Sequence, residues 1–156
     1  MSGKLKNEIK QSKPFANVQE EVVLSLIRTA DQLVTPMTEA LRVENLSLSQ
    51  YNILRILRGA RGQGLPCGEI AERMVSRDPD LTRLLDRLEK RGLVARTRGT
   101  ADRRVVLTTL TPQGLALLGD LDGTTQSILK KTLAHMPKER LNLLCELLEE
   151  ARDGGD

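Results

Sequence analysis

The chain has 156 residues, which is enough for one ordinary domain with additional helices and excludes two domains of full size. Only 1% of the residues are aromatic, so the core must be aliphatic, which favours packed helices over a β-sandwich. The net charge is only +3, but ten basic and five acidic residues lie between Arg73 and Arg104, so the basic excess is confined to one segment.

Several classes of protein are excluded by features that the sequence lacks. No run of about 18 apolar residues and no leader sequence occurs, so we expect a cytoplasmic protein without a membrane partner. Cys67 and Cys145 match neither a disulfide framework nor a zinc pattern, and each is expected to be a buried apolar thiol. His135 alone cannot build a metal site, and neither a nucleophile with its base nor a phosphate-binding glycine loop is present. We therefore expect no enzyme activity, metal or cofactor.

The first third of the chain predicts one long helix. The first dozen residues are polar and are expected to be frayed. From Val18 to Val34 the apolar residues recur every three or four positions, which indicates an amphipathic helix. Pro36 is expected to kink or end this helix, with Met37 and Leu41 continuing its apolar face.

Three further helices are predicted before residue 92. Ser47 stands three residues before Gln50, the spacing of a capping box, and the helix that it opens should stop at the glycines 59, 62 and 64. A short helix follows over residues 67–74, with Ile70, Ala71 and Met74 buried. Asp78 and Pro79 then open a helix that ends at Gly92. Its buried face is made by leucines at positions 81, 84, 85 and 88.

After Gly92 the apolar period changes to two. Residues 93–98 and 103–110 read as the two strands of a hairpin whose short tip is "GTAD". Thr111 and Pro112 open another long helix, and Pro137 opens the last. The predicted fold is mainly α, a winged helix-turn-helix over residues 44–110. An arm and dimerisation helix over 1–43 and dimerisation helices over 111–156 flank it.

The helix after Asp78 carries the first group of candidate DNA-binding residues. The second helix of a helix-turn-helix enters the major groove. Since the leucines define the buried face, the outward residues are Thr82, Arg83, Asp86, Arg87 and Lys90. Arginine can bind guanine through paired hydrogen bonds, and threonine can bind a base or a phosphate. An ordinary charged solvent face is the alternative.

The hairpin carries the second group. In an extended strand residues two apart point the same way, so Asp102 is expected to pair with Arg104 while Arg103 points to the other side. Such a pair would hold the guanidinium outstretched, and a narrow A·T-rich minor groove attracts arginine. Arg96 and Arg98 are expected to line one side of the facing strand and to contact phosphate. The alternative is a cross-strand ion pair that serves solubility.

Three segments, "LSLSQYNILRIL", "GEIAERM" and "LTRLLDRLEKRGLVARTRGTADRRVVLTTLTPQGLALL", resemble the MarR family of bacterial transcriptional regulators. The resemblance implies a homodimer whose first and last helices intertwine and which binds a pseudo-palindromic double-stranded DNA operator. It implies that Thr82 and Arg83 meet the major groove and that Arg104, braced by Asp102, enters the minor groove. The full expected DNA-binding set is Arg77, Pro79, Thr82, Arg83, Arg87, Arg98, Asp102, Arg103 and Arg104.

Two features of the resemblance leave alternatives open. Asp80 stands where the family usually has a small hydroxyl or neutral residue, and it could accept a hydrogen bond from cytosine or, as we favour, stabilise the amino end of the helix. The family also implies a pocket for a small phenolic or other aromatic acid, for which Tyr51 and Arg55 are the candidate anchors. Thiol-based redox control through Cys67, which precedes a helix, is the rival.

The leading hypothesis is therefore a sequence-specific DNA-binding regulator, and more specifically a repressor released by a small effector. A winged-helix module that uses its basic face to bind an acidic protein is the rival from another class. Preference for one operator at rising salt would distinguish the two.

Overall fold

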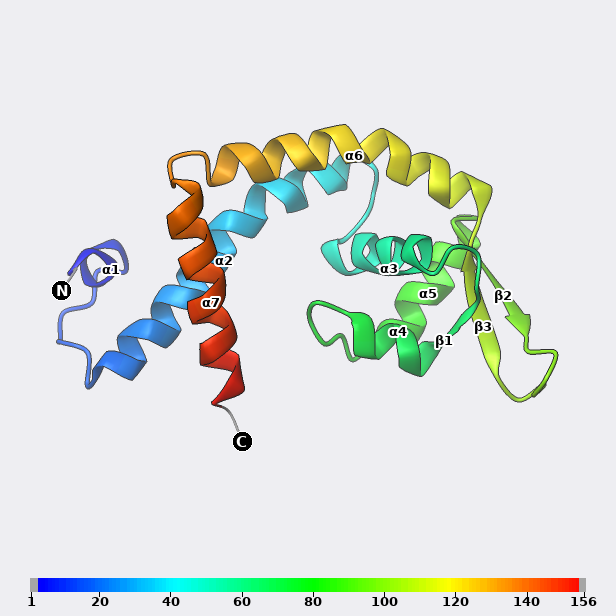
Figure 1. The fold of residues 1–156 in the computed structure, drawn as a ribbon, viewed down its shortest axis with the longest axis horizontal. Coiled ribbons are helices and arrows are strands. Elements are labelled where there is room, and N and C mark those ends of the chain that lie inside the picture. The colour runs from blue at the N-terminus through cyan, green and yellow to red at the C-terminus, as the bar shows by residue number, and fades with distance from the viewer. Residues whose placement is uncertain (1–2, 155–156) are drawn as a thin grey trace. The chain divides into compact units, whose positions relative to one another are not determined.

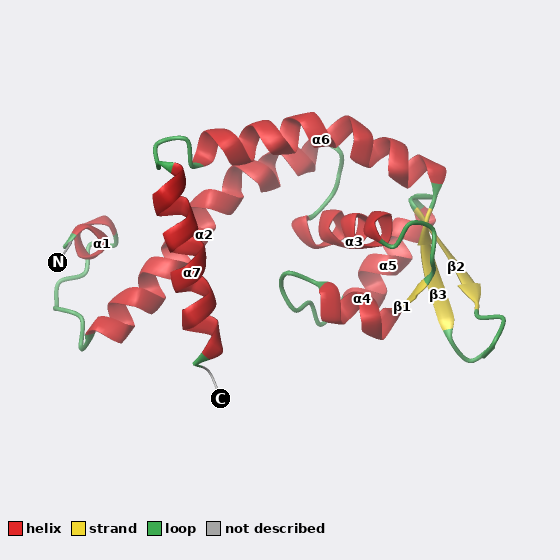
Figure 2. Cartoon of the chain, in the orientation of Figure 1, coloured by secondary structure: helices red, strands yellow, loops and turns green. Residues whose placement is uncertain are grey.

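The structure is a computed structural model that describes residues 3–154. Helices dominate it, and the strands form one small sheet (Figures 1 and 2). The chain divides into two units, residues 1–48 and residues 49–156. The mainly helical winged-helix class predicted from the sequence is confirmed.

The first unit consists of α1 (Lys4–Glu8) and α2 (Val18–Val43). The expectation of a frayed amino-terminal segment is wrong for α1. The predicted start of α2 at Val18 is confirmed. The helix begins there because the Asn17 side chain accepts a hydrogen bond from the Glu20 amide at 2.8 Å. The Glu20 carboxylate in turn accepts from the Ala16 amide at 2.6 Å. These two bonds satisfy amides that the helix itself leaves without a partner.

The helix α2 does not end at Pro36, which lies inside its 26 residues. Proline removes one backbone hydrogen bond, and the many intact bonds of so long a helix keep the chain helical on both sides. Met37 and Leu41 are buried, whereas the predicted apolar stripe nearer the start is largely exposed. The side chains of Val22, Val23, Leu26 and Ile27 are 39% to 62% exposed.

The second unit contains the helix-turn-helix. Its helices are α3 (Leu48–Gly59), α4 (Cys67–Arg73) and α5 (Leu81–Lys90). The predicted leucine face of α5 is confirmed, since the leucines 81, 84, 85 and 88 are all buried. In α4 Ile70 is buried as expected. The predicted burial of Ala71 and Met74 is wrong, because Ala71 is exposed and Met74, which follows the last residue of the helix, is partly exposed.

The sheet has three antiparallel strands, β1 (Leu65–Pro66), β2 (Val94–Arg98) and β3 (Val106–Leu110), in the order β1-β3-β2. The strand β1 was not predicted, because two residues are too few to show a period. The two hairpin strands are shorter than expected, and the pair Arg98 and Val106 is the last in register. Arg103 and Arg104 therefore lie in the loop of the wing and not in a strand.

Two glycines and a threonine join α5, β2 and α6 (Pro112–Thr132). Gly92 has a φ of 70°, and its amide donates to the Glu89 carbonyl, which ends α5 as predicted. The Thr111 hydroxyl donates to the Gly92 carbonyl at 2.6 Å and accepts from the Gly114 amide at 3.1 Å. This threonine therefore caps α6, as predicted, and ties the helix to the end of α5.

The last two helices bury few side chains. The predicted positions Leu118 and Leu121 of α6 are buried, whereas Leu115 and Leu129 are about half exposed. The helix α7 (Lys138–Asp153) has no buried residue in the described part of the chain. Cys67 and Cys145 are both exposed, so their predicted burial is wrong, because α4 and α7 carry them on outward faces.

Gly114 offers a test of the junction between the wing and α6. A Cβ atom at this position would overlap the Leu93 carbonyl oxygen, a backbone atom that cannot rotate away. We expect Gly114→Ala to lower the free energy of unfolding by about 1–3 kcal/mol, measured by urea denaturation. Gly119→Ala is the control, because its Cβ meets nothing within 4 Å and alanine favours the helix by about 1 kcal/mol. Equal stability of the two variants would contradict this description.

Candidate nucleic-acid interface

The outward face of α5 is polar and largely exposed. Thr82, Arg83, Arg87 and Lys90 are all exposed, while the leucines opposite them are buried. Asp86 and Glu89 are less accessible, because both bond to a residue of the wing. The helix thus presents three cationic side chains and one hydroxyl to solvent.

The turn before α5 has a defined backbone. The helix α5 begins at Leu81, two residues later than predicted. The reason is that the Asp78 carboxylate accepts a hydrogen bond from the Asp80 amide at 2.9 Å and holds residues 78–80 in a turn. Arg77 and Pro79 are exposed in this turn. Asp80 is the residue before the helix, but its side chain makes no capping hydrogen bond.

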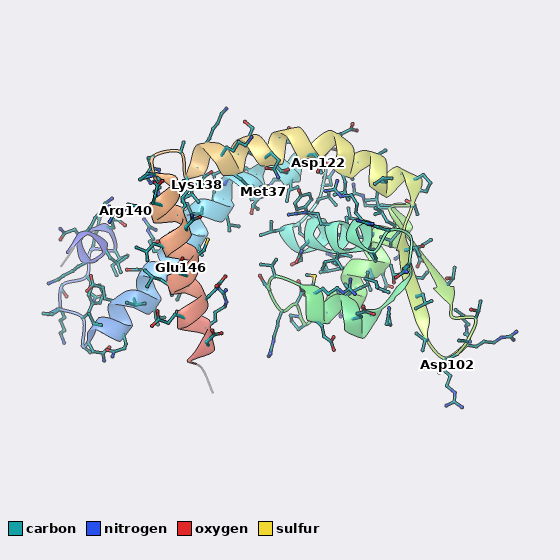
Figure 3. The ribbon with its side chains drawn as sticks, viewed as in Figure 1. Met37, Asp102, Asp122, Lys138, Arg140 and Glu146 are labelled. Atoms are coloured by element: carbon teal, nitrogen blue, oxygen red, sulfur yellow. The ribbon has the colours of Figure 1, made fainter. Side chains whose placement is uncertain are left out.

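The loop of the wing, residues 99–105, is closed by backbone hydrogen bonds. The Gly99 amide donates to the Val105 carbonyl at 2.8 Å, and the Val105 amide donates to the Asp102 carbonyl at 3.2 Å. The Asp102 carboxylate accepts from the backbone amide of Arg104 at 2.9 Å. Figure 3 shows Asp102 at the end of the loop that joins β2 to β3.

The expected side-chain pair between Asp102 and Arg104 is therefore wrong. Among the described residues, the side chains of Asp102 and Arg104 form no ion pair with each other. The chain turns at Arg103, so the alternating geometry of a strand does not apply. Asp102 instead fixes the backbone from which the Arg104 side chain projects. Both side chains are exposed, as is that of Arg103.

All nine residues predicted to bind DNA are exposed. Three of them lie in α5, two in the turn before it, one at the end of β2 and three in the wing loop. The structure thus brings them together as two neighbouring elements of one small domain, since α5 packs on β2. Their contacts with DNA remain predictions.

Arg96 was expected to contact phosphate, but its guanidinium bonds to two carboxylates of the protein instead. Its Nη2 donates to Asp86 Oδ1 and to Glu89 Oε2, each at 2.6 Å, and its Nε donates to Glu89 Oε2 at 2.9 Å. The Arg96 backbone amide donates to Glu89 Oε1 at 3.2 Å. The guanidinium is thus committed to two carboxylates of α5, three residues apart on one face of the helix.

The ionisation of this cluster follows from its hydrogen bonds. Bonds from Arg96 lower the pKa of the Glu89 carboxyl below its ordinary value, and bonds to Glu89 and Asp86 raise the pKa of the Arg96 guanidinium. The charged forms of both residues are therefore favoured. Sequence reasoning missed the cluster, although two acids three residues apart on one helix were a visible signal.

The candidate effector residues lie together. Tyr51 is buried, and its hydroxyl donates to Thr125 Oγ1 of α6 at 3.3 Å. The Arg55 guanidinium carbon lies 5.9 Å from the centre of the Tyr51 ring, and the Arg55 side chain is exposed. Nearby, Arg58 forms a forked ion pair with Asp122 of α6 at 2.8 to 3.1 Å, and this bond raises the pKa of Arg58. These contacts join α3 to α6.

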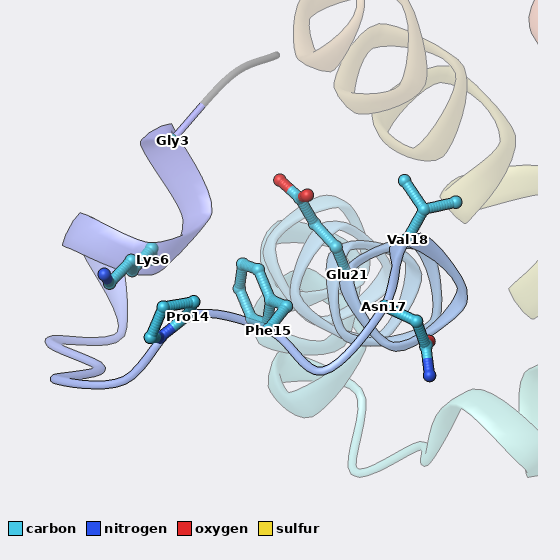
Figure 4. A pocket seen from close by; sticks show the side chains of 7 residues that line it. All are labelled: Gly3, Lys6, Pro14, Phe15, Asn17, Val18 and Glu21. Carbon is cyan, nitrogen blue, oxygen red and sulfur yellow. The ribbon is translucent and has the colours of Figure 1, made fainter.

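A separate hollow of about 470 Å³ lies in the first unit. Figure 4 shows that Lys6, Pro14 and Phe15 come from the segment before α2, and that Val18 and Glu21 come from its first turns. Neither Tyr51 nor Arg55 lines it.

Within residues 3–154 no group of three or more potential metal ligands comes together. Over the same residues, no helix combines the length and the apolar character needed to cross a membrane.

The sequence pattern of the MarR family matches residues 46–106, which include α3, α4, α5, β1 and β2 and end at the first residue of β3. The crystal structure of a MarR transcription factor from Planctomyces limnophilus is 40% identical, with 87% of this chain and 98% of that chain covered and a TM-score of 0.67. The chain belongs to the MarR family. It is a transcriptional regulator, and the resemblance stated from its sequence motifs is confirmed.

Two other relatives extend the comparison. The transcriptional repressor MdtR of Bacillus subtilis is 28% identical over 80% of this chain and 79% of its own. The structure of Bordetella bronchiseptica BpsR, described with the regulation of its DNA binding by 6-hydroxynicotinic acid, is 24% identical. It covers 92% of this chain and 100% of its own with a TM-score of 0.79, which shows the shared fold.

Proposed function

We propose that this MarR-family regulator is a homodimeric repressor that binds a pseudo-palindromic DNA operator and is released by a small acid. The observation that carries the proposal is the joint exposure of the polar face of α5 and the basic loop of the wing. A winged helix places these two elements in adjacent grooves of one duplex.

The role of each residue follows from its position and chemistry. Thr82 and Arg83 stand in the first turn of α5, where a recognition helix meets base edges. Arg104 extends from a backbone held by Asp102, and its planar cation suits a narrow minor groove. Arg77, Arg87, Arg98 and Arg103 lie around these two contacts and are assigned to the phosphate backbone, and Pro79, which has no hydrogen-bond donor, is assigned to van der Waals contact with the DNA backbone.

Replacement of Arg104 tests the wing. We expect Arg104→Ala to weaken binding to an operator selected from genomic fragments by roughly 1–3 kcal/mol, because one groove contact is lost. A gel-shift titration measures the change. Arg152→Ala, which removes an exposed arginine on the side of α7 opposite Leu143, should leave the affinity unchanged.

Unchanged affinity of Arg104→Ala would remove the wing from the mechanism. If the unaltered protein shows no preference for any DNA as salt rises, the alternative of a module that binds an acidic protein is favoured instead.

The dimer is supported by apolar surface that the single chain leaves open. In α2 four apolar residues between Val22 and Ile27 are 39% to 62% exposed, and in α7 Leu143 and Leu147 are 50% and 51% exposed. Leu143 and Leu147 are four residues apart and share one helix face. Surfaces of this kind mark interaction sites, and a two-fold dimer would present two α5 helices to half-sites about 34–36 Å apart.

Light scattering tests the dimer. We expect a mass twice the 17.3 kDa of one chain, and we expect Leu147→Glu to shift it toward one chain by placing a charge in the apolar interface. Glu146→Gln is the matched control on the neighbouring position and should remain dimeric. A monomeric unaltered protein would overturn the two-half-site arrangement.

The effector proposal rests on Tyr51 and Arg55. Their stacked arrangement puts an exposed cation beside an aromatic ring, and a carboxylate on an aromatic ligand can pair with the cation. BpsR is described with regulation by 6-hydroxynicotinic acid, an acid of this type.

We therefore expect 6-hydroxynicotinic acid to release the operator in a gel-shift titration. Arg55→Ala should raise the concentration needed for half release about tenfold, because a charge-assisted hydrogen bond is lost. Arg152→Ala again serves as the control. Equal sensitivity of Arg55→Ala and the unaltered protein would remove Arg55 from the site, and an insensitive unaltered protein would overturn this ligand class.

A further inference from the structure

We infer that Arg96 is a positioning residue for operator recognition: through Asp86 and Glu89 its guanidinium fixes how α5 presents its outward side chains relative to the wing. The inference rests on the proposed DNA-binding function and deepens it. Arg96 itself contacts protein and not DNA.

The geometry of the cluster carries the first step. Arg96 belongs to β2, and both of its partners belong to α5. Three side-chain bonds of 2.6 to 2.9 Å and one backbone bond of 3.2 Å join the strand to the helix. A planar guanidinium forms such a set only in one orientation, so these bonds limit rotation of the helix about its own axis.

The leucine face of α5 cannot supply that limit alone. Its contacts with the core are apolar, and apolar burial is not directional. The helix has only ten residues, and its carboxyl end turns at Gly92 straight into the wing. Arg96 holds this second half of α5, where Asp86 and Glu89 lie next to the outward residue Arg87.

The charges carry the second step. Two carboxylates on a helix that meets DNA would by themselves repel phosphate. A protein that needed only positive potential would do better without them. Their bonds to Arg96 leave the cluster with one net negative charge, held among side chains that are 25% to 45% exposed. The acids are therefore explained by orientation of the helix and not by attraction to DNA.

This reasoning predicts a result opposite to that of simple electrostatics. The double variant Asp86→Asn/Glu89→Gln preserves the shapes of both side chains but removes two negative charges. Simple electrostatics predicts tighter binding to every duplex. Positioning predicts weaker binding to the operator, because the base contacts of α5 lose their alignment, with unchanged or tighter binding to a duplex of scrambled sequence.

The experiment measures both dissociation constants in a fluorescence-anisotropy titration with the full chain. We expect the ratio of scrambled to operator dissociation constants to fall about tenfold in the double variant, the loss of about one aligned base contact. Arg96→Lys should lower the same ratio, because an ammonium keeps the charge but cannot form the fork.

The control variant is Glu72→Gln/Asp120→Asn, which makes the same chemical changes at exposed carboxylates of α4 and α6. Its ratio should stay within about twofold of that of the unaltered protein, because non-specific attraction acts equally on both duplexes. Partial unfolding lowers the active fraction for both duplexes alike, so the ratio separates positioning from a loss of stability.

Each outcome has one meaning. An unchanged or increased ratio of dissociation constants in Asp86→Asn/Glu89→Gln overturns the inference. An Arg96→Lys variant with the same ratio as the unaltered protein overturns it as well. An unaltered protein that does not distinguish operator from scrambled duplex overturns the proposed function instead, before any variant is compared.

Discussion

The burial of four leucines on one side of α5 is the constraint on which the rest of the domain depends. Because leucines 81, 84, 85 and 88 occupy the inward positions, every polar residue of the helix must face solvent or a neighbouring strand. Apolar burial thus decides which side chains of α5 face outward. It leaves the rotation of the helix less restrained, and the bonds from Arg96 supply the directional part.

The junction at the end of the wing links this helix to α6. Thr111 bonds both Gly92 and Gly114, and the Gly114 backbone lies against the Leu93 carbonyl. The ion pair of Arg58 with Asp122 and the bond from Tyr51 to Thr125 join α3 to the same helix. The helix-turn-helix and the wing are therefore connected to α6 by specific polar contacts on two sides, and Tyr51 and Arg55 lie at one of them. An effector bound there would act on contacts that hold α6 to the domain.

The sequence predicted most of the helical fold, because amphipathic periods and caps are local. The start of α2, the buried face of α5 and the cap at Thr111 each follow from residues close together in the sequence, at most seven positions apart in α5. The errors occurred where local patterns compete with more distant bonds. The alternation of "RRVVLTTL" predicted a strand from Arg103, but backbone bonds across residues 99–105 close a loop there. The two-residue strand β1 exists only because β3 lies beside it.

The same division applies to the candidate interface. Sequence alone determined which residues are charged and which are outward on α5, because helical spacing relates them directly, and all nine predicted residues are exposed. It could not show that Arg96 turns to Asp86 and Glu89 or that Asp102 bonds a backbone amide, because both depend on where β2 and the wing loop pass relative to other backbone. Only the tertiary structure decided these pairings, since a charged side chain can reach any partner that the fold brings within hydrogen-bond distance.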